Sequence, residues 1–176
     1  MEVNAKADYA VRAVVELAGS NKESPRKLDE IAAAQAIPPA YLTTIVMELR
    51  NAGVIRSQRG PGGGIWLARP AEELDLGSVM RAVGGPLVAV RGQMPQEVAY
   101  VGSAVALQQV WLALDASLRN VLESVTVADV AAGKLPQDTL ALTRGDPVAG
   151  GGALDTPGKV LRRIPGGVLG ARASSS

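Results

Sequence analysis

The sequence contains no cysteine and no histidine. Without thiols it forms no disulfide and holds no iron–sulfur cluster on thiolates. Without imidazole it has no histidine zinc site and no catalytic triad that depends on a histidine base. A metal site built only from carboxylates stays open in principle. We therefore predict a protein that is not an enzyme and carries no cofactor.

Long hydrophobic runs and an excess of one charge are also missing. No stretch is apolar enough to span a bilayer, and the N-terminal stretch MEVNAKADYAVRAVVELAG mixes charges into its apolar residues, unlike a signal peptide. Lys and Arg number 18 against 17 Asp and Glu, a formal net charge of +1. Only local charge can therefore indicate a nucleic-acid partner. We expect a cytoplasmic protein without a membrane partner.

The chain divides into three zones that differ in how regularly apolar residues recur. Residues 1–84 are densely patterned and residues 85–134 form a second patterned stretch. Residues 135–176 are rich in Gly, Pro and Ser, and their apolar residues show no sustained period. Because ordering this last zone would bury too little apolar surface to offset the lost entropy, we predict a disordered tail.

The first zone reads as three helices followed by a hairpin. Apolar residues recur at helical spacing over residues 4–18, which predicts a first helix. A shorter second helix is expected around position 31, and Pro39 opens a third helix that ends near Gly53. Two β-prone runs then flank GPGGG. This order predicts a mainly α fold with a small β-hairpin, a winged helix-turn-helix whose third helix can enter a DNA major groove.

The loop GPGGG, residues 60–64, could serve phosphates or simply turn the chain. A nucleotide-binding loop is disfavoured because no Lys follows Gly64 and Ile65 interrupts the dinucleotide pattern. A hairpin fits better, since Gly supplies the positive φ angles of a tight turn. Four arginines and no acid lie in residues 50–69, namely Arg50, Arg56, Arg59 and Arg69. We favour DNA contact, with Arg59 reaching a minor groove, over a solvated turn.

The motifs IPPAYL and LRNAGVIRSQRGPGGGIWLARP, in this order, resemble the winged-helix repressors that include IscR, NsrR and CymR. The resemblance covers residues 3–92 well and continues more loosely to about residue 134. It implies a homodimer on an inverted-repeat operator, with the third helix in the major groove and the wing on the adjacent minor groove. By position it implies DNA contacts from Pro39, Tyr41, Thr43 and Thr44 on the helix and from Arg59, Gly60 and Gly63 on the wing, with Lys6 and Tyr9 as backbone contacts at best.

Three departures from these relatives limit what can be carried over. Many relatives have longer polar residues in place of Thr43 and Thr44, so no operator sequence follows. Lys27 stands where relatives often place a Ser cap, which indicates either a phosphate contact or a weak cap. The cluster cysteines are missing from residues 88–106, which leaves Asp8, the place of a carboxylate ligand in some relatives, a surface residue. The signal is then a small effector near residues 86–106, a partner protein, or absent.

Residues 103–125 contain the longest regular apolar pattern in the chain. Its members are spaced 4, 3, 4, 3 and 4 residues apart, namely Leu107, Trp111, Leu114, Leu118, Val121 and Val125. The stripe either packs on its own N-terminal domain or forms an intersubunit seam, and we favour a dimerisation helix. A fourth helix, packing back on the hairpin, is expected to end near Gly84, and a short closing helix is expected at residues 127–130.

These patterns predict a dimeric, sequence-specific DNA-binding regulator, most simply a repressor. Two rival classes remain. A winged helix used as a protein–protein adaptor would bind with little dependence on salt, whereas DNA binding weakens steeply as salt rises. A nucleotide-binding enzyme would be stabilised by nucleotide in the absence of DNA.

Overall fold

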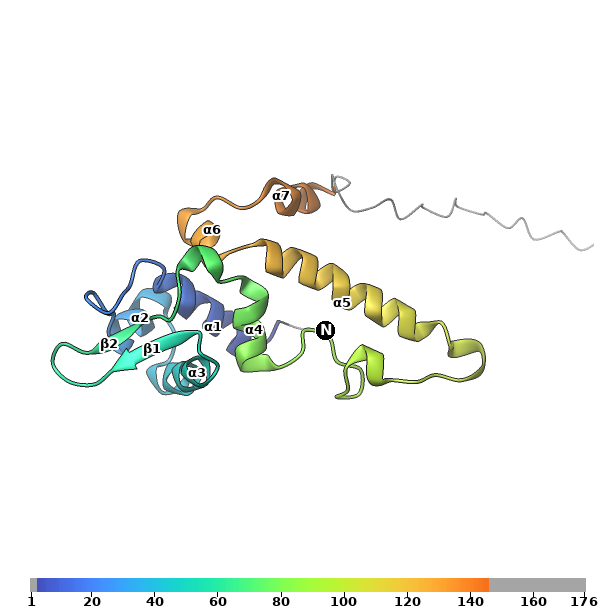
Figure 1. Cartoon of the computed structure of the whole chain (residues 1–176), viewed down its shortest axis with the longest axis horizontal. Coiled ribbons are helices and arrows are strands. Elements are labelled where there is room, and N and C mark those ends of the chain that lie inside the picture. The colour runs from blue at the N-terminus through green and yellow to red at the C-terminus, as the bar shows by residue number, and fades with distance from the viewer. Residues whose placement is uncertain (1–2, 146–176) are drawn as a thin grey trace, which may run out of the picture.

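The computed structural model describes residues 3–145, which form a helical protein with a single two-stranded hairpin (Figure 1). This arrangement confirms the predicted mainly α fold with a winged helix-turn-helix. The helices and strands are α1 (Ala5–Glu16), α2 (Leu28–Gln35), α3 (Pro39–Asn51), β1 (Ile55–Gln58), β2 (Gly64–Leu67), α4 (Leu76–Gly84), α5 (Leu107–Ser124), α6 (Val127–Ala132) and α7 (Gln137–Arg144). Short 3-10 turns lie at Ala71–Glu73 (η1), Pro95–Glu97 (η2) and Gly102–Ala104 (η3).

Helix α1 is the centre of the N-terminal unit. The Asn4 side chain caps it by accepting a hydrogen bond from the Ala7 amide at 2.9 Å. One face is small and fully buried, with Ala10 and Val14 at 0% exposure. Small side chains let neighbouring helices approach closely, and α1 accordingly packs on α2, α3, α4 and α6.

The turn between α2 and α3 sets the angle of the helix pair. Ala36 ends α2 in the left-handed conformation with φ 49°, and Pro39 opens α3 at its first position. Gly53, with φ 73°, follows the end of α3 as predicted. Leu42, Ile45 and Leu49 of α3 are fully buried, so the opposite face of the helix is directed outward.

The hydrophobic core extends beyond the first 84 residues. Val127 of α6 is fully buried in the same cluster as α1, α3 and α4. The chain returns there through two backbone bonds, from the Leu76 amide to the Val125 carbonyl at 3.0 Å and from the Val127 amide to the Leu74 carbonyl at 2.8 Å. The short closing helix expected at residues 127–130 is therefore confirmed as α6 and completes the N-terminal unit.

Helix α6 begins with a reciprocal cap. Thr126 Oγ1 accepts from the Asp129 amide at 3.1 Å, while the Asp129 carboxylate accepts from the Thr126 amide and hydroxyl. Hydrogen bonding from the Thr126 backbone and then its side chain lowers the pKa of Asp129. The carboxylate is thus ionised and the cap complete at neutral pH.

Helix α4 departs from the expected packing. It ends at Gly84 as predicted, but it packs on α1, α3 and α5 rather than chiefly on the hairpin. The reason is its apolar side: Val79 and Val83 are buried in the core cluster that α1 and α3 share. Helix α4 is consequently the element that joins the N-terminal unit to α5.

Helix α5, yellow in Figure 1, projects from the N-terminal unit, with its C-terminal end beside α6 and its first residues far from that unit. Its main contacts in the described chain are α4 and η2, and none of its own 18 residues is buried. Five of the six predicted seam residues lie on it, from Leu107 to Val121. Val125 does not: it follows the helix and is buried at 3% exposure within its own chain, so its assignment to the seam was wrong.

The zone after residue 134 is partly helical. Residues 137–144 form α7, which corrects the expectation that disorder begins at residue 135. The helix starts after Pro136 and ends at Gly145 in a left-handed cap with φ 75°. The remainder of the predicted tail lies outside the described residues. Among residues 3–145, no helix combines the length and apolarity needed to cross a membrane.

Candidate nucleic-acid interface

The outward face of α3 carries mostly uncharged side chains. All four helix residues singled out from the sequence are exposed on it: Pro39, Tyr41, Thr43 and Thr44. Met47 continues the same face at 49% exposure. Because the buried residues Leu42, Ile45 and Leu49 fix the opposite side, the orientation of this face is set by the core.

The two threonines differ in what their hydroxyls can do. Thr43 Oγ1 donates to the carbonyl of Pro39 at 2.9 Å, one turn earlier in the helix. For Thr44, no side-chain hydrogen bond is formed with any residue in the described range 3–145. Thr44 therefore offers a free donor and acceptor, whereas Thr43 presents chiefly its methyl group.

Tyr41 is held in place by α1. Its ring meets that of Tyr9 edge to face, with centroids 5.7 Å apart and planes at 81°. The Arg12 guanidinium in turn stacks on the Tyr9 ring, 5.4 Å from its centre. Tyr9 thus supports a residue of the exposed face.

A single carboxylate lies on α3, and α1 neutralises it. Lys6 Nζ is 2.7 Å from Glu48 Oε2, with both side chains about one-third exposed, at 31% and 30%. No local pattern predicts this pair, because the two residues lie on different helices and 42 positions apart. The exposed face of α3 consequently carries no uncompensated negative charge.

Three glycines of the hairpin loop are required by its own geometry. Gly60 has φ 104°, which side chains rarely adopt. A Cβ on Gly63 would lie 2.1 Å from the Gln58 carbonyl oxygen, and one on Gly64 would lie 2.6 Å from the Arg26 carbonyl oxygen. Gly62, in contrast, has open space around it. The tight fold of the chain is therefore sufficient reason for glycine at these three positions.

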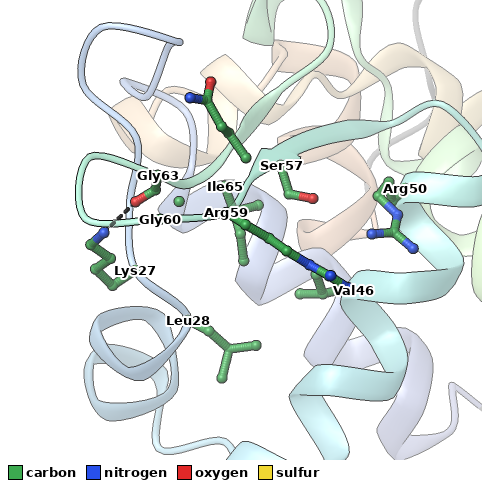
Figure 2. Close-up of a pocket in the computed structure, with 11 residues that line it drawn as sticks. Lys27, Leu28, Val46, Arg50, Ser57, Arg59, Gly60, Gly63 and Ile65 are labelled. Carbon is green, nitrogen blue, oxygen red and sulfur yellow. Dashed lines mark hydrogen bonds between the residues drawn. The ribbon is translucent and has the colours of Figure 1, made fainter.

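A groove of about 480 Å3 separates the hairpin from α2 and α3. Its walls include Lys27, Arg50, Arg59 and the backbone of Gly60 and Gly63 (Figure 2). Figure 2 shows the Arg59 side chain extending from the hairpin toward Val46 of α3. In this conformation Arg59 lies across the groove instead of projecting beyond the tip of the loop.

Four arginines on α3 and around the hairpin differ from the other arginines of residues 3–145 in having no partner within that range. Arg50, Arg56, Arg59 and Arg69 are exposed, and their side chains form no ion pair, hydrogen bond or ring contact within residues 3–145. Elsewhere in the described chain carboxylates pair with Arg12, Arg26, Arg81 and Arg119. The positive charge of this surface is therefore available to an external anion.

Lys27 does not stand free in solvent. Its ammonium donates to the carbonyl of Pro61 at 3.2 Å. It also donates to the carbonyl of Gly63, as Figure 2 shows. Glu30 Oε2 accepts from the Lys27 amide at 3.1 Å, which is half of a capping box. The other half is missing because an ammonium group has no acceptor. Lys27 is both a weak cap, as considered from the sequence, and a contact to the wing.

The residues do not fit an iron centre of the kind held by cysteine. The whole chain has no Cys and no His, and residues 3–145 contain no group of three Asp or Glu placed to hold a metal ion. Asp8 instead pairs with Arg12 at 3.2 Å on the surface of α1.

A second groove of about 580 Å3 lies between α4 and α5. The segment 85–96 forms one wall, with Pro86, Leu87 and Met94, and α5 contributes Leu112 and Arg119. This groove falls in the stretch where a small effector was considered from the sequence. A molecule bound there would touch both the N-terminal unit and the helix that projects from it.

Comparison with known proteins agrees with this geometry. The Rrf2 family, described as iron-dependent transcriptional regulators, matches residues 3–133. The HTH-type transcriptional regulator Rv1287 of Mycobacterium tuberculosis is 46% identical over 142 residues, covering 81% of this chain and 88% of that protein. The HTH-type transcriptional regulator CymR of Bacillus subtilis is 30% identical over 131 residues, covering 74% and 90%.

Solved structures give the same result. CymR of B. subtilis, described as its global cysteine regulator, superposes with a TM-score of 0.64 at 29% identity and covers 76% of this chain and 98% of its own. IscR of T. potens superposes with a TM-score of 0.60 at 30% identity, covering 76% and 88%. The predicted resemblance to the CymR and IscR regulators is confirmed. The chain, with its winged helix-turn-helix, therefore belongs to the Rrf2 family of DNA-binding transcriptional regulators.

Proposed function

We propose that the chain is a cytoplasmic repressor that acts as a homodimer on an inverted-repeat operator. Each α3 enters a major groove, and each wing follows the backbone into the adjacent minor groove. The two recognition helices then lie about one helical turn of DNA, roughly 34 Å, apart.

The observation that carries this proposal is the set of unpaired arginines around the wing. An exposed guanidinium without a carboxylate partner keeps its full attraction for phosphate. Arg50 and Arg59 line the groove between α3 and the hairpin, so their charge lies beside the exposed face of α3. A DNA backbone crossing this groove would meet positive charge on both sides.

The exposed face of α3 suits direct readout of bases. Thr44 offers a free hydroxyl, and the methyl groups of threonine make apolar contact with the thymine methyl group. Tyr41 is fixed by Tyr9, which lowers the entropy lost when DNA binds. We infer that Tyr41 and Thr44 contact bases, while Pro39 and Thr43 shape the N-terminal turn of the helix.

The dimer is inferred from the exposure of α5. Leu107 and Val110 are 39% and 53% exposed, and the helix contributes no buried residue to the described chain. An 18-residue helix with an apolar stripe is expected to bury that stripe against something. A second copy of α5 would bury the apolar stripe and give the two-fold symmetry of an inverted repeat.

Any effector is proposed to act through the groove between α4 and α5. Its ligand would change the angle between α5 and the N-terminal unit, because both elements line the groove. A change in that angle alters the spacing of the recognition helices, and with it operator affinity.

The test starts by selecting bound sequences from a random duplex library with the full chain. Fluorescence anisotropy of the selected duplex is then measured between 50 and 200 mM salt. We expect a two-fold-symmetric consensus and an affinity that falls by roughly 10³ or more if six or more phosphates are contacted. Failure to enrich any sequence, together with salt-independent binding of a protein partner, would instead identify an adaptor.

A further inference from the structure

Two consecutive residues, Arg26 and Lys27, connect the wing to the helices. They lie between α1 and the start of α2, and each makes contacts in two directions. The backbone of Arg26 forms a β-bridge with Ile65 of β2, and the side chain of Lys27 reaches the tip of the loop. The wing is therefore attached at its base and at its tip.

The attachment at the base is a pair of backbone hydrogen bonds. The Arg26 amide donates to the Ile65 carbonyl at 2.9 Å, and the Ile65 amide donates to the Arg26 carbonyl at 2.8 Å. Gly64 makes this approach feasible, since a Cβ there would lie 2.6 Å from the Arg26 carbonyl oxygen. Arg26 thus extends the two-stranded hairpin by one bridge.

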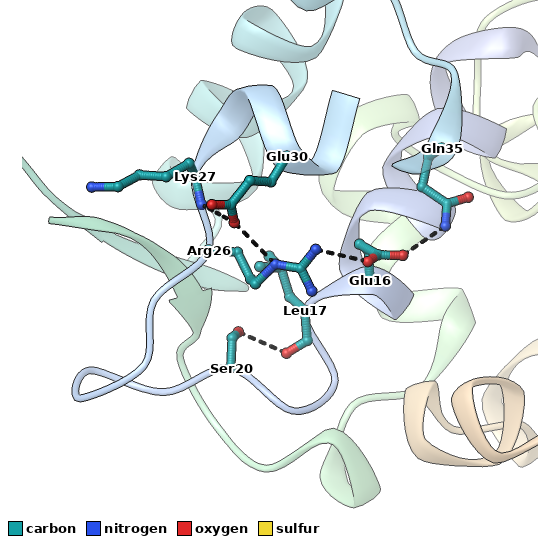
Figure 3. A network of polar contacts seen from close by, with 7 residues as sticks. All are labelled: Glu16, Leu17, Ser20, Arg26, Lys27, Glu30 and Gln35. Atoms are coloured by element: carbon teal, nitrogen blue, oxygen red, sulfur yellow. Dashed lines mark hydrogen bonds and ion pairs between the residues drawn. The ribbon is translucent and has the colours of Figure 1, made fainter. Parts of the chain in front are cut away.

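The side chain of Arg26 ties the same segment to two helices (Figure 3). Its guanidinium is 3.0 Å from Glu16 Oε1 of α1 and 3.2 Å from Glu30 Oε2 of α2. Gln35 Nε2 donates to the second oxygen of Glu16 at 2.8 Å. The segment that carries the wing is accordingly fixed to the ends of α1 and α2.

Among the hydrogen bonds within residues 3–145, only those of Lys27 attach the tip of the loop to the helices. The Lys27 ammonium donates to the carbonyls of Pro61 and Gly63, 34 and 36 residues away in sequence. These are two of its three N–H groups, directed at the loop and not outward. The loop's own bond, from the Gly63 amide to the Gly60 carbonyl at 3.0 Å, lies beside them.

We propose that Lys27 is a positioning residue that fastens the tip of the wing, and that it is not a phosphate ligand. The ammonium spans from the N-terminus of α2 to a loop whose glycine backbone has little intrinsic stiffness. Holding the loop before DNA arrives lowers the entropy lost on binding. The effect on DNA rests on the proposed function of the wing, whereas the effect on the free protein does not.

The first measurement uses the DNA-free protein. Amide hydrogen exchange is followed at Gly62, Gly63 and Ile65 in the parent and in Lys27→Met, which keeps the aliphatic stem and removes the donors. We expect exchange at Gly63 to accelerate by on the order of tenfold to a hundredfold, the size of losing one hydrogen bond from a charged donor. Lys27→Arg, which keeps donors, should stay close to the parent.

Lys22→Met is the matched control. Lys22 is exposed in the same connecting segment, and its side chain forms no hydrogen bond or ion pair among residues 3–145, so the substitution removes equal charge without removing a bond to the wing. Its exchange profile should equal that of the parent. Unchanged exchange in Lys27→Met, or an equal acceleration in Lys22→Met, would overturn the positioning role.

The second measurement is the salt dependence of DNA affinity. Lys27→Met should weaken binding several-fold while leaving the slope of log K against log salt unchanged, because no phosphate contact is lost. A slope lower by about one would identify Lys27 as a phosphate ligand and overturn the proposal. Faster exchange with unchanged affinity would support the fastening of the loop and contradict DNA contact by the wing, which is a failure of the proposed function alone.

Discussion

Lys6 Nζ lies 2.7 Å from Glu48 Oε2, so that a residue of α1 neutralises the only carboxylate on α3. An ion pair whose side chains are about one-third exposed contributes little to stability, about 0–1 kcal/mol. Its consequence is electrostatic, because an unpaired Glu48 would repel a phosphate backbone approaching the exposed face of the helix.

Lys6→Ala is therefore expected to weaken DNA binding more than it weakens the fold. We expect a loss of affinity of several-fold at low salt, with a melting temperature close to that of the parent. Fluorescence anisotropy and thermal denaturation measure the two effects. The double variant Lys6→Ala/Glu48→Gln removes both charges and should recover most of the affinity. If it binds as weakly as Lys6→Ala, then Lys6 contacts DNA directly.

Arg59→Ala tests the assignment of the wing. Arg59 is exposed and unpaired within residues 3–145, and its side chain lies across the groove beside α3. Its loss should cost about 1–3 kcal/mol in binding and relax any A·T preference beside each half-site, since a minor-groove arginine responds to groove width.

The control for Arg59→Ala is Lys134→Ala, which removes one exposed positive charge between α6 and α7. Both variants are compared on the selected operator and on a duplex whose flanks are changed to G·C. Equal behaviour of the two variants on both duplexes would show that Arg59 is an ordinary surface charge.

Leu118→Asp tests the dimerisation helix. Leu118 is half-buried in the middle of the α5 stripe, where a carboxylate in an apolar interface would lie against its symmetry mate. We expect monomers by sedimentation and a large loss of operator affinity. Asn120→Asp adds the same charge at an exposed position on the opposite side of α5 and should stay dimeric. A dimer that persists in Leu118→Asp would place the interface elsewhere.

Local patterns in the sequence were enough to predict α3 and the hairpin. The spacing of Leu42, Ile45 and Leu49 defines the buried side of α3, and the glycines between two β-prone runs indicate a turn. Both features depend on neighbouring residues and on a period that the sequence displays directly.

Contacts between distant segments could not be predicted in the same way. No residue near Lys27 in the sequence indicates that its ammonium reaches Gly63. Likewise, the spacing that includes Val125 does not show that the helix ends before it and that its side chain is buried within its own chain. Helix α7 was missed because its eight residues are flanked by a segment rich in glycine and proline, which dominates the composition of the zone.

Ala36→Gly is expected to stabilise the fold. Ala36 ends α2 with φ 49°, a conformation that costs a residue with a Cβ about 1–2 kcal/mol, while glycine adopts it freely. Glycine also loses more entropy on folding, so the net gain should be about 0.5–1 kcal/mol. Ala33→Gly, at an exposed position inside α2, meets only the entropic cost and should destabilise by a similar amount. Urea denaturation of both variants measures the difference, and the same sign in both would mean that the turn before α3 carries no strain.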